Sequence, residues 1–393
     1  MQVIDLKAQY AALKEEIDAN IQSVLDAAQF ISGPQVKELE QQLAAFVGRK
    51  HCISCANGTD ALQVAFMIAG VGEGDAVFCP DMTFISSTEP SKMFGAASVF
   101  CDITTDTYTL CPESLERQIK AVLAEGKLTP KAVVAVDILG NPCDYDAIIP
   151  ICEKYGLILI EDAAHSIGTR YNGEPIGSIA DMTTFSFHPV KTVTSGEGGA
   201  VTTNDPVLYQ KLVLAHAHGI TRNRGQMIHP TDDPWYYEQV KLGYNYRMTE
   251  FQAALLMSQL KKLEAFSKRR KEIVKMYDEA FSRIPELKVQ KEIPKSDTTR
   301  HLYILQLDDK KLNCTRREFF DALRAENIYS QVHYIPVYWH SHYKNLGYSK
   351  GLCPNAEHYY QQSMSLPLYY SLTDEDVKDV IHAVEKLVAY YKK

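Results

Sequence analysis

The chain has 393 residues, a net charge of −8, an apolar fraction of 46% and a charged fraction of 23%. This length allows two domains with a sizeable core, and the composition is that of an ordinary globular protein. The negative charge gives no support for binding nucleic acid, and no apolar stretch approaches the roughly 18 residues of a membrane span. The N-terminal stretch MQVIDLKAQYAALKEEIDANIQSVL carries acids and lysines where a signal peptide would be apolar, so we expect a cytoplasmic protein.

Nine cysteines are scattered along the chain, and only Cys52 and Cys55 form a C-x-x-C motif. A redox or metal site would need a second pair or a nearby His/Cys cluster at ligand spacing, and none follows this motif. We therefore expect reduced cysteines that serve packing, and no metal site.

Short apolar runs alternate with helical patterns over the first 250 residues. The runs are rich in Val, Ile and Leu and lack the polar alternation of a strand with one solvated face. Strands buried on both faces have this composition, so the pattern predicts a mostly parallel sheet covered by helices on both sides. The runs are 75–80, 96–103, 132–139 and 157–164.

The pattern changes near residue 249, where residues 248–281 form one long amphipathic helical pattern. Thr249 is the expected N-cap of this helix, and Gln252 completes a capping-box signature. We place a domain boundary near residue 260. The division predicts a large domain over 1–260, including an N-terminal arm, and a small domain over 261–393.

The small domain is expected to be α+β. Asn327 follows a helical pattern, and asparagine is the usual residue other than glycine at a left-handed helix C-terminus. The expected elements are a strand at 301–307, a helix at 315–328, a strand at 329–334 and a final helix at 373–393.

Two features of the large domain suit a phosphate group. Asn57, Gly58 and Thr59 open directly into an apolar helical pattern, where free backbone amides, a glycine and a hydroxyl favour an anion. The same residues also make an ordinary N-cap, so this signal is weak alone. Ser186 lies five residues before Lys191, a spacing at which the hydroxyl can hold a phosphate while the lysine reaches the far side of the same ring.

Asp162 and Phe84 each follow a predicted strand. A carboxylate at the carboxyl end of a buried strand needs a positive or strongly donating partner, and a protonated pyridine nitrogen would serve. A helix cap or an internal salt bridge is the alternative for Asp162. Phe84 either lies against an aromatic ring or packs in the core.

Lys191 lies between small and apolar residues, and residues 186–200 contain no other lysine or arginine. A desolvated ammonium group loses its proton more readily than an exposed one, which suits an amine that must be neutral during a reaction. The large domain thus offers the four groups that pyridoxal 5'-phosphate needs. They are the residues suited to a phosphate, an aromatic ring to stack on the cofactor (Phe84), an acid for the ring nitrogen (Asp162) and a lysine for the Schiff base (Lys191).

Three motifs in this order resemble the DegT/DnrJ/EryC1/StrS family of sugar aminotransferases: EDAAHSIG, SFHPVKTVTSGEGGAV and LGYNYRMTEFQAAL. The resemblance covers most of the chain, from IDLKAQY to SLPLYYSLTDEDV. It implies the fold type I (aspartate aminotransferase) α/β architecture, with a mostly parallel seven-stranded sheet in the large domain and a smaller α+β C-terminal domain. It also implies a homodimer with shared active sites.

The resemblance also assigns roles to individual residues. Lys191 would hold the cofactor as an internal aldimine and act as the acid/base catalyst, with pyridoxamine 5'-phosphate as the second cofactor form. Asp162 would pair with the ring nitrogen, and His165 would lie near the ring hydroxyl. The remaining assignments are Gly58, Thr59 and Ser186 to the phosphate, Phe84 to the ring face, and Asn245 to the phosphate in the partner subunit.

The resemblance implies transfer of an amino group from L-glutamate to a nucleotide-linked keto sugar. Segments near the middle are similar to members acting on UDP-linked 4-keto-6-deoxy-N-acetylhexosamines, which we favour. The N-terminal stretch is closer to members acting on UDP-3-keto-N-acetylglucuronate. Another pyridoxal phosphate reaction, or a non-catalytic regulatory role, remains as a further alternative. Because Lys191 is present where dehydratase relatives have histidine, transamination is favoured over dehydration.

Three local features bear on the substrate. Many relatives have arginine where Ala217 precedes His218, so any contact by that arginine is in doubt here. Asn141 follows Gly140 where relatives often have Gln or Leu, and we expect this position to bear on the choice of sugar. The polar loop 222–238 is either a source of substrate contacts or a mobile surface loop.

Overall fold

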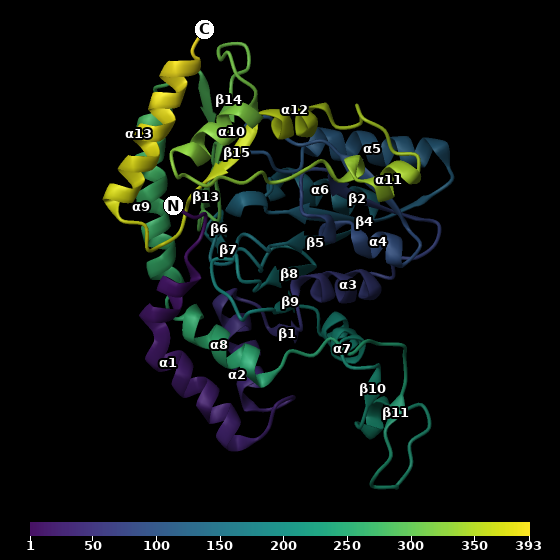
Figure 1. The fold of residues 1–393 in the computed structure, drawn as a ribbon. Coiled ribbons are helices and arrows are strands. Elements are labelled where there is room, and N and C mark those ends of the chain that lie inside the picture. Colours follow the sequence, from purple (N-terminus) through teal and green to yellow (C-terminus); the bar gives the residue numbers. More distant parts are fainter.

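The computed structural model describes all 393 residues and contains a central seven-stranded sheet (Figure 1). One strand, β9, runs antiparallel to both of its neighbours, β1 and β8, and the remaining pairings are parallel. The expected mostly parallel seven-stranded sheet is therefore confirmed. In spatial order the strands are β1 (His51–Cys55), β9 (Gly199–Thr203), β8 (Met182–Ser186), β5 (Ile158–Asp162), β4 (Thr129–Val136), β2 (Asp75–Pro80) and β3 (Ala97–Cys101).

Four of the seven strands, β2, β3, β4 and β5, overlap the four predicted apolar runs, and helices cover both faces of the sheet. Successive side chains of β4 enter different cores: Val133 belongs to one buried cluster and Val134 to the other. One face is covered by α3 (Gly58–Ile68) and α7 (Pro206–Ala215). The other is covered by α1 (Leu6–Ala27), α2 (Pro34–Phe46), α5 (Pro112–Glu125), α6 (Tyr145–Tyr155) and α8 (Glu250–Leu260).

The C-terminal part builds a third core on a three-stranded antiparallel sheet in the order β12-β14-β15. Its helices α9 and α13 run side by side along one edge of the molecule (Figure 1). The elements are α9 (Leu263–Phe281), β12 (Leu287–Val289), β14 (Tyr303–Leu307), α10 (Arg316–Ala325), α11 (Ser341–Asn345), α12 (Pro354–Gln362), β15 (Ser363–Leu366) and α13 (Asp374–Tyr391).

Short elements complete the chain. They are α4 (Glu89–Met93), the two-residue strands β6 (Arg170–Tyr171), β7 (Glu174–Pro175), β10 (Ile220–Thr221), β11 (Glu238–Gln239) and β13 (Ser296–Asp297), and the 3-10 turns η1 (Ile85–Ser87), η2 (Ile138–Gly140), η3 (Arg224–Gln226) and η4 (Val337–Trp339). Strands β10 and β11 form the base of a hairpin that projects away from the body of the molecule (Figure 1).

Two expectations about the C-terminal elements were wrong. The single long helix is two helices, because α8 packs against the N-terminal helices while α9 packs against α13, and the exposed Lys261 and Lys262 form the break. Residues 329–334 form no strand beyond one bridge between Gln331 and Ser365. The segment pairs with the edge strand β15 at this one point only and then runs on to the cavity, where the Tyr334 hydroxyl contacts His165.

Several local predictions are confirmed. Thr249 accepts a hydrogen bond from the Gln252 amide, and the Gln252 side chain accepts from the Thr249 amide, which completes the capping box. Asn327 has a left-handed φ of 61°. The division near residue 260 stays a prediction, and α8 ends and α9 begins on either side of it.

The cysteines are free thiols, and most of them are buried. Cys52 and Cys55 are buried free thiols, and burial raises the pKa of both above its ordinary value, which makes them poor nucleophiles. No group of three or more His, Cys, Asp and Glu side chains is arranged to hold a metal ion. None of the helices combines the length and the apolar character needed to cross a membrane.

The turn around Asn141 ties the large sheet to the chain that leads into the C-terminal part. The Asn141 side chain donates to the carbonyls of Thr107 and Lys291 and accepts from the amide of Ile293, and it is 2% exposed. These three bonds direct the amide into the protein, so Asn141 does not face a ligand. Direct contact between the Asn141 side chain and the sugar is therefore excluded, and an indirect effect on the choice of sugar stays a prediction.

Candidate active site

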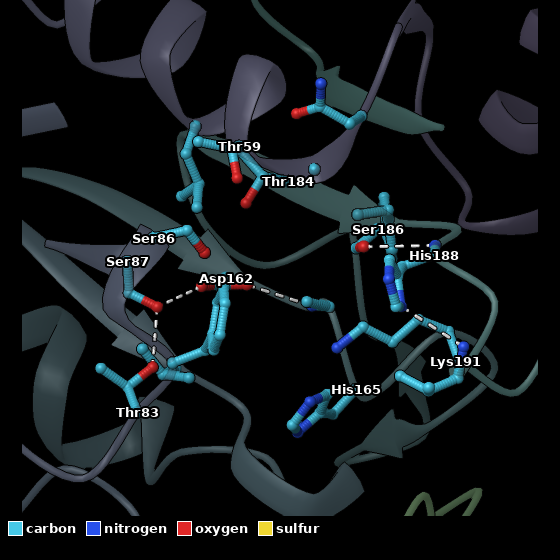
Figure 2. Close-up of a pocket in the computed structure, with 18 of the residues that line it drawn as sticks. Thr59, Thr83, Ser86, Ser87, Asp162, His165, Thr184, Ser186, His188 and Lys191 are labelled. Atoms are coloured by element: carbon cyan, nitrogen blue, oxygen red, sulfur yellow. Dashed lines mark hydrogen bonds between the residues drawn. The ribbon is translucent and has the colours of Figure 1, made fainter. Parts of the chain in front are cut away.

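A cavity of about 740 Å³ lies at the carboxyl ends of β4, β5 and β8, the edge of a parallel sheet where ligands bind (Figure 2). Its wall combines the start of α3, the segment after β2, the end of β5 and the loop between β8 and β9. Two residues of the C-terminal part, His333 and Tyr334, complete it. Of the eight residues assigned from the sequence, seven line this cavity: Gly58, Thr59, Phe84, Asp162, His165, Ser186 and Lys191.

One end of the cavity is built by the first turn of α3 against the last residue of β8. The Asn57 side chain caps α3 by accepting from the Asp60 amide at 2.8 Å, and Gly58 is the first helical residue. A Cβ atom on Gly58 would lie 2.7 Å from the Cβ of Ser186, so only glycine permits this approach. The helix N-terminus and the Ser186 hydroxyl together form a site suited to an anion.

Asp162 ends β5 and is 5% exposed. Its carboxylate accepts from the Ser87 hydroxyl at 2.6 Å and from the Ala164 amide at 3.2 Å, and the Ser87 hydroxyl in turn contacts that of Thr83 (Figure 2). No lysine or arginine forms a salt bridge with it. Burial raises the pKa of Asp162, and these hydrogen bonds and the nearby Lys191 amine oppose the rise. The carboxylate keeps acceptor capacity for a donor in the cavity.

Lys191 lies in the loop between β8 and β9, where its backbone amide closes a turn onto the His188 carbonyl. Its amine has no hydrogen-bond partner or salt bridge in the protein and points into the cavity beside His165 (Figure 2). Burial lowers the pKa of Lys191 to about 8, although Asp162 acts in the opposite direction. The amine is therefore partly neutral near physiological pH, as its apolar sequence setting predicted.

Phe84 and Tyr334 form a wall of aromatic rings. Phe84 is 51% exposed, so half of its surface is available to a ligand, and its ring centroid lies 5.9 Å from that of Tyr334. The alternative in which Phe84 packs in the core is wrong.

Three side chains next to Lys191 were not identified from the sequence. His333 and Tyr334 line the cavity, and the His301 ring packs against His165 in a tilted arrangement with centroids 4.3 Å apart. The pKa values of His165, His301 and His333 are lowered, mainly by burial and next by the positive charge of Lys191. These three histidines are therefore neutral. The only sequence signal for these residues is the adjacent His333 and Tyr334 at the end of segment 329–334, which was predicted as a strand.

The outer rim of the cavity carries charged groups. His188 Nε2 lies 3.9 Å from Glu197 Oε1, and both side chains are about half exposed. Asp60, on the first turn of α3, has its pKa raised to about 6 by burial, with a smaller contribution from Glu197. Lys191 is thus the only lysine or arginine among the lining residues.

Asn245 does not belong to this cavity. Its side chain is exposed, and its backbone pairs with Ala217 at the base of the projecting β10–β11 hairpin. The hairpin loop also carries its aromatic residues away from the cavity, with Trp235 72% exposed. The prediction that loop 222–238 supplies substrate contacts is therefore not met within one chain.

Comparison with known proteins agrees with this arrangement. Residues 11–385 match the DegT/DnrJ/EryC1/StrS aminotransferase family. The spore coat polysaccharide biosynthesis protein SpsC of Bacillus subtilis is 40% identical over 95% of both chains. A UDP-4-amino-4,6-dideoxy-N-acetyl-beta-L-altrosamine transaminase of Campylobacter jejuni is 32% identical over 99% of this chain and 96% of that protein.

Two further similarities concern a second sugar class and the fold. A UDP-2-acetamido-2-deoxy-3-oxo-D-glucuronate aminotransferase of Pseudomonas aeruginosa is 34% identical over 98% of this chain and 99% of that protein. The crystal structure of a DegT DnrJ EryC1 StrS aminotransferase from Brucella abortus superposes with a TM-score of 0.90, at 34% identity and full coverage of both chains. This chain therefore belongs to the DegT/DnrJ/EryC1/StrS aminotransferase family, and it is an aminotransferase.

The lowered pKa of Lys191 predicts how the acylation of its amine depends on pH. With a pKa of about 8, about one Lys191 amine in ten is neutral at pH 7, against roughly one in three thousand for an ordinary lysine. In the cofactor-free protein, acylation of Lys191 followed by mass spectrometry should rise with a midpoint near pH 8. In Asp162→Asn the midpoint should fall further, because the attracting charge is lost.

The control is the same lysine in the urea-unfolded chain, whose midpoint should lie near the ordinary value of about 10.5. Equal midpoints for Lys191 in the folded and unfolded chains would contradict this account of the site.

Proposed function

We propose that the cavity binds pyridoxal 5'-phosphate. The residues fit this group in three respects: an anion site where Gly58 meets Ser186, a buried carboxylate on Asp162 with spare acceptor capacity, and the unpartnered amine of Lys191. Thr59 and Ser186 would hold the phosphate, Phe84 would face the ring, and His165 would lie near the ring hydroxyl. When bound, the cofactor supplies an electron-withdrawing ring that stabilises negative charge on the substrate carbon next to the nitrogen.

The side chains of this chain then have separate tasks. Asp162, held in place by Ser87 and Ala164, would keep a proton on the ring nitrogen. Lys191 would attach the cofactor covalently and, once released as a neutral amine, move a proton to and from the substrate carbon. The low pKa of Lys191 suits this task, because an amine that is partly neutral near pH 7 can both accept and donate a proton.

We propose that the amino donor is L-glutamate and that the acceptor is a nucleotide-linked keto sugar. Named relatives that act on UDP sugars, from Campylobacter and Pseudomonas, cover almost the whole chain and support this class of substrate. The reaction would run in two halves, with the amino group carried by the pyridoxamine form of the cofactor between them.

A 4-keto-6-deoxy-N-acetylhexosamine linked to UDP is the acceptor that we favour. The charged groups at the rim favour it over a 3-keto-glucuronate: Asp60 and Glu197 are acidic, and the lining has no cation besides Lys191. Within one chain, the lining thus offers a uronate carboxylate no lysine or arginine partner besides Lys191, whereas a 6-deoxy sugar needs none. A purely regulatory role is disfavoured because Lys191, Asp162 and Ser186 are all in place in one cavity.

The acceptor can be identified by following the cofactor through both half-reactions. Protein converted with glutamate to the pyridoxamine form is mixed with a panel of UDP-linked 4-keto and 3-keto sugars, and the visible absorbance is recorded. We expect a 4-keto-6-deoxy sugar to restore the pyridoxal spectrum at least tenfold faster than a 3-keto-glucuronate. The opposite order would show that the uronate is the substrate, and no response to glutamate would contradict the proposed donor.

We also propose that the enzyme works as a homodimer in which Asn245 completes the partner's cavity. The support is geometric: Asn245 is exposed and lies outside the cavity of its own chain, beside a projecting hairpin that exposes Trp235 and Ile228. Exposed apolar side chains on one projecting hairpin are available for contact with a second copy of the chain.

Subunit mixing tests this arrangement. Lys191→Ala and Asn245→Ala are each expected to be nearly inactive, because each lesion falls in both sites of its homodimer. A hybrid dimer has one site with both lesions and one intact site, so refolding the two together at equal amounts should restore about a quarter of wild-type activity. Activity that is no higher in the mixture than in the separate variants would contradict a shared site.

A further inference from the structure

The peptide of Leu139 fixes the orientation of His165. Leu139 lies in the turn η2 with a left-handed φ of 64°, and its amide donates to His165 Nδ1 at 3.1 Å. Its carbonyl accepts from the amides of His301 at 3.1 Å and Leu302 at 3.4 Å. Hydrogen bonds therefore hold both peptide groups that flank Leu139, one to His165 and the other to the C-terminal part.

This contact determines which nitrogen of His165 carries the proton. A ring nitrogen that accepts from an amide cannot itself be protonated, so the single proton of the neutral ring must lie on Nε2. The doubly protonated ring is excluded as well, because it would place two N–H groups against each other in a buried site. The pKa of His165 lies well below its ordinary value because of burial and the positive charge of Lys191.

On its other side, the His165 ring contacts the hydroxyl of Tyr334. It lies 3.4 Å from His165 Nε2, and because that nitrogen carries the proton, the Tyr334 oxygen must be the acceptor. The hydroxyl has no other hydrogen bond in the protein, and Tyr334 lines the cavity. Burial and the negative charge of Asp162 raise the pKa of Tyr334, so the hydroxyl keeps its proton.

We propose that Tyr334 donates a hydrogen bond to an oxygen of the ligand, and that the Leu139–His165 contact fixes the direction of this donation. The proposal rests on the proposed function, because it concerns the cofactor and sugar of that same cavity. The acceptor oxygen belongs either to the cofactor or to the keto sugar, and these two sources have different consequences. Tyr334 is then a catalytic residue supplied by the C-terminal part, and Leu139 is a positioning residue.

Tyr334→Phe removes the hydroxyl and keeps the ring beside Phe84. If the oxygen belongs to the cofactor, its dissociation constant should rise about tenfold and the pH midpoint of its visible absorbance should shift, without any substrate present. If the oxygen belongs to the sugar, cofactor affinity, spectrum and the glutamate half-reaction should stay unchanged, while KM for the sugar rises about tenfold. The proposal fails if none of these quantities changes.

Tyr329→Phe is the matched control, because it lies five residues earlier and its hydroxyl forms no hydrogen bond. It should leave the cofactor spectrum and both half-reactions as in the wild type.

The tautomer of His165 is measured separately in the cofactor-free protein by imidazole ¹⁵N shifts, assigned with His165→Gln. We expect a protonated Nε2 and an unprotonated Nδ1 between pH 6 and 9; a proton on Nδ1 would overturn the proposal. This measurement and the cofactor titration need no sugar. If no sugar reacts with the wild type, the substrate assignment fails, while a changed cofactor titration in Tyr334→Phe still supports donation to the cofactor, and a proton on His165 Nδ1 still overturns the proposal.

Discussion

A carboxylate buried at the end of a parallel strand has to be stabilised by groups around it, and the site is organised around this constraint at Asp162. The first support is local, from the Ser87 hydroxyl and the Ala164 amide. The second is the amine of Lys191, which approaches without forming a salt bridge and whose pKa falls to about 8. Because neither group fully neutralises the other within the protein, both remain available to a ligand.

The same edge of the sheet requires close packing at the opposite end of the cavity. Gly58 lies so close to Ser186 that a single added carbon atom would collide with it. This approach brings the amides at the start of α3 next to the end of β8. The anion site formed there is separate from the carboxylate of Asp162. A ligand with a phosphate at one end and a basic ring nitrogen at the other matches this separation of charge.

The C-terminal part closes the cavity and also acts on its chemistry. His333 and Tyr334 line the wall, and the amides of His301 and Leu302 hold the Leu139 peptide that orients His165. The residues that set the proton positions around Lys191 therefore come from both ends of the chain. Movement of one part relative to the other would change the cavity wall and this hydrogen-bond path together.

The sequence predicted the large sheet and most of the site, because these depend on local patterns. Apolar runs identified the buried strands, and the flanking residues of Lys191 already indicated a desolvated amine. The apolar run 157–164 placed Asp162 at the carboxyl end of a strand, which the structure bears out.

The rest depends on contacts between distant segments, and no local pattern encodes them. His301 and Tyr334 reach the site only because the C-terminal part packs against η2. Segment 329–334 has strand composition, but it pairs with the edge strand β15 at Gln331 only, and its last residue contacts His165 in the cavity wall. The helical pattern of 248–281 continues across the break between α8 and α9, which two different packing partners impose. The three internal hydrogen bonds of the Asn141 side chain likewise join segments far apart in the sequence.

The central claim is that Lys191, facing Asp162 in this cavity, is the amine that attaches the cofactor. The most direct test is to load the full-length protein with pyridoxal 5'-phosphate, fix the attachment with borohydride, and map the modified peptide by mass spectrometry. The account predicts a single modified lysine, Lys191, and no fixed cofactor in Lys191→Ala. Cofactor fixed mainly to any other lysine, or spread over several, would contradict it.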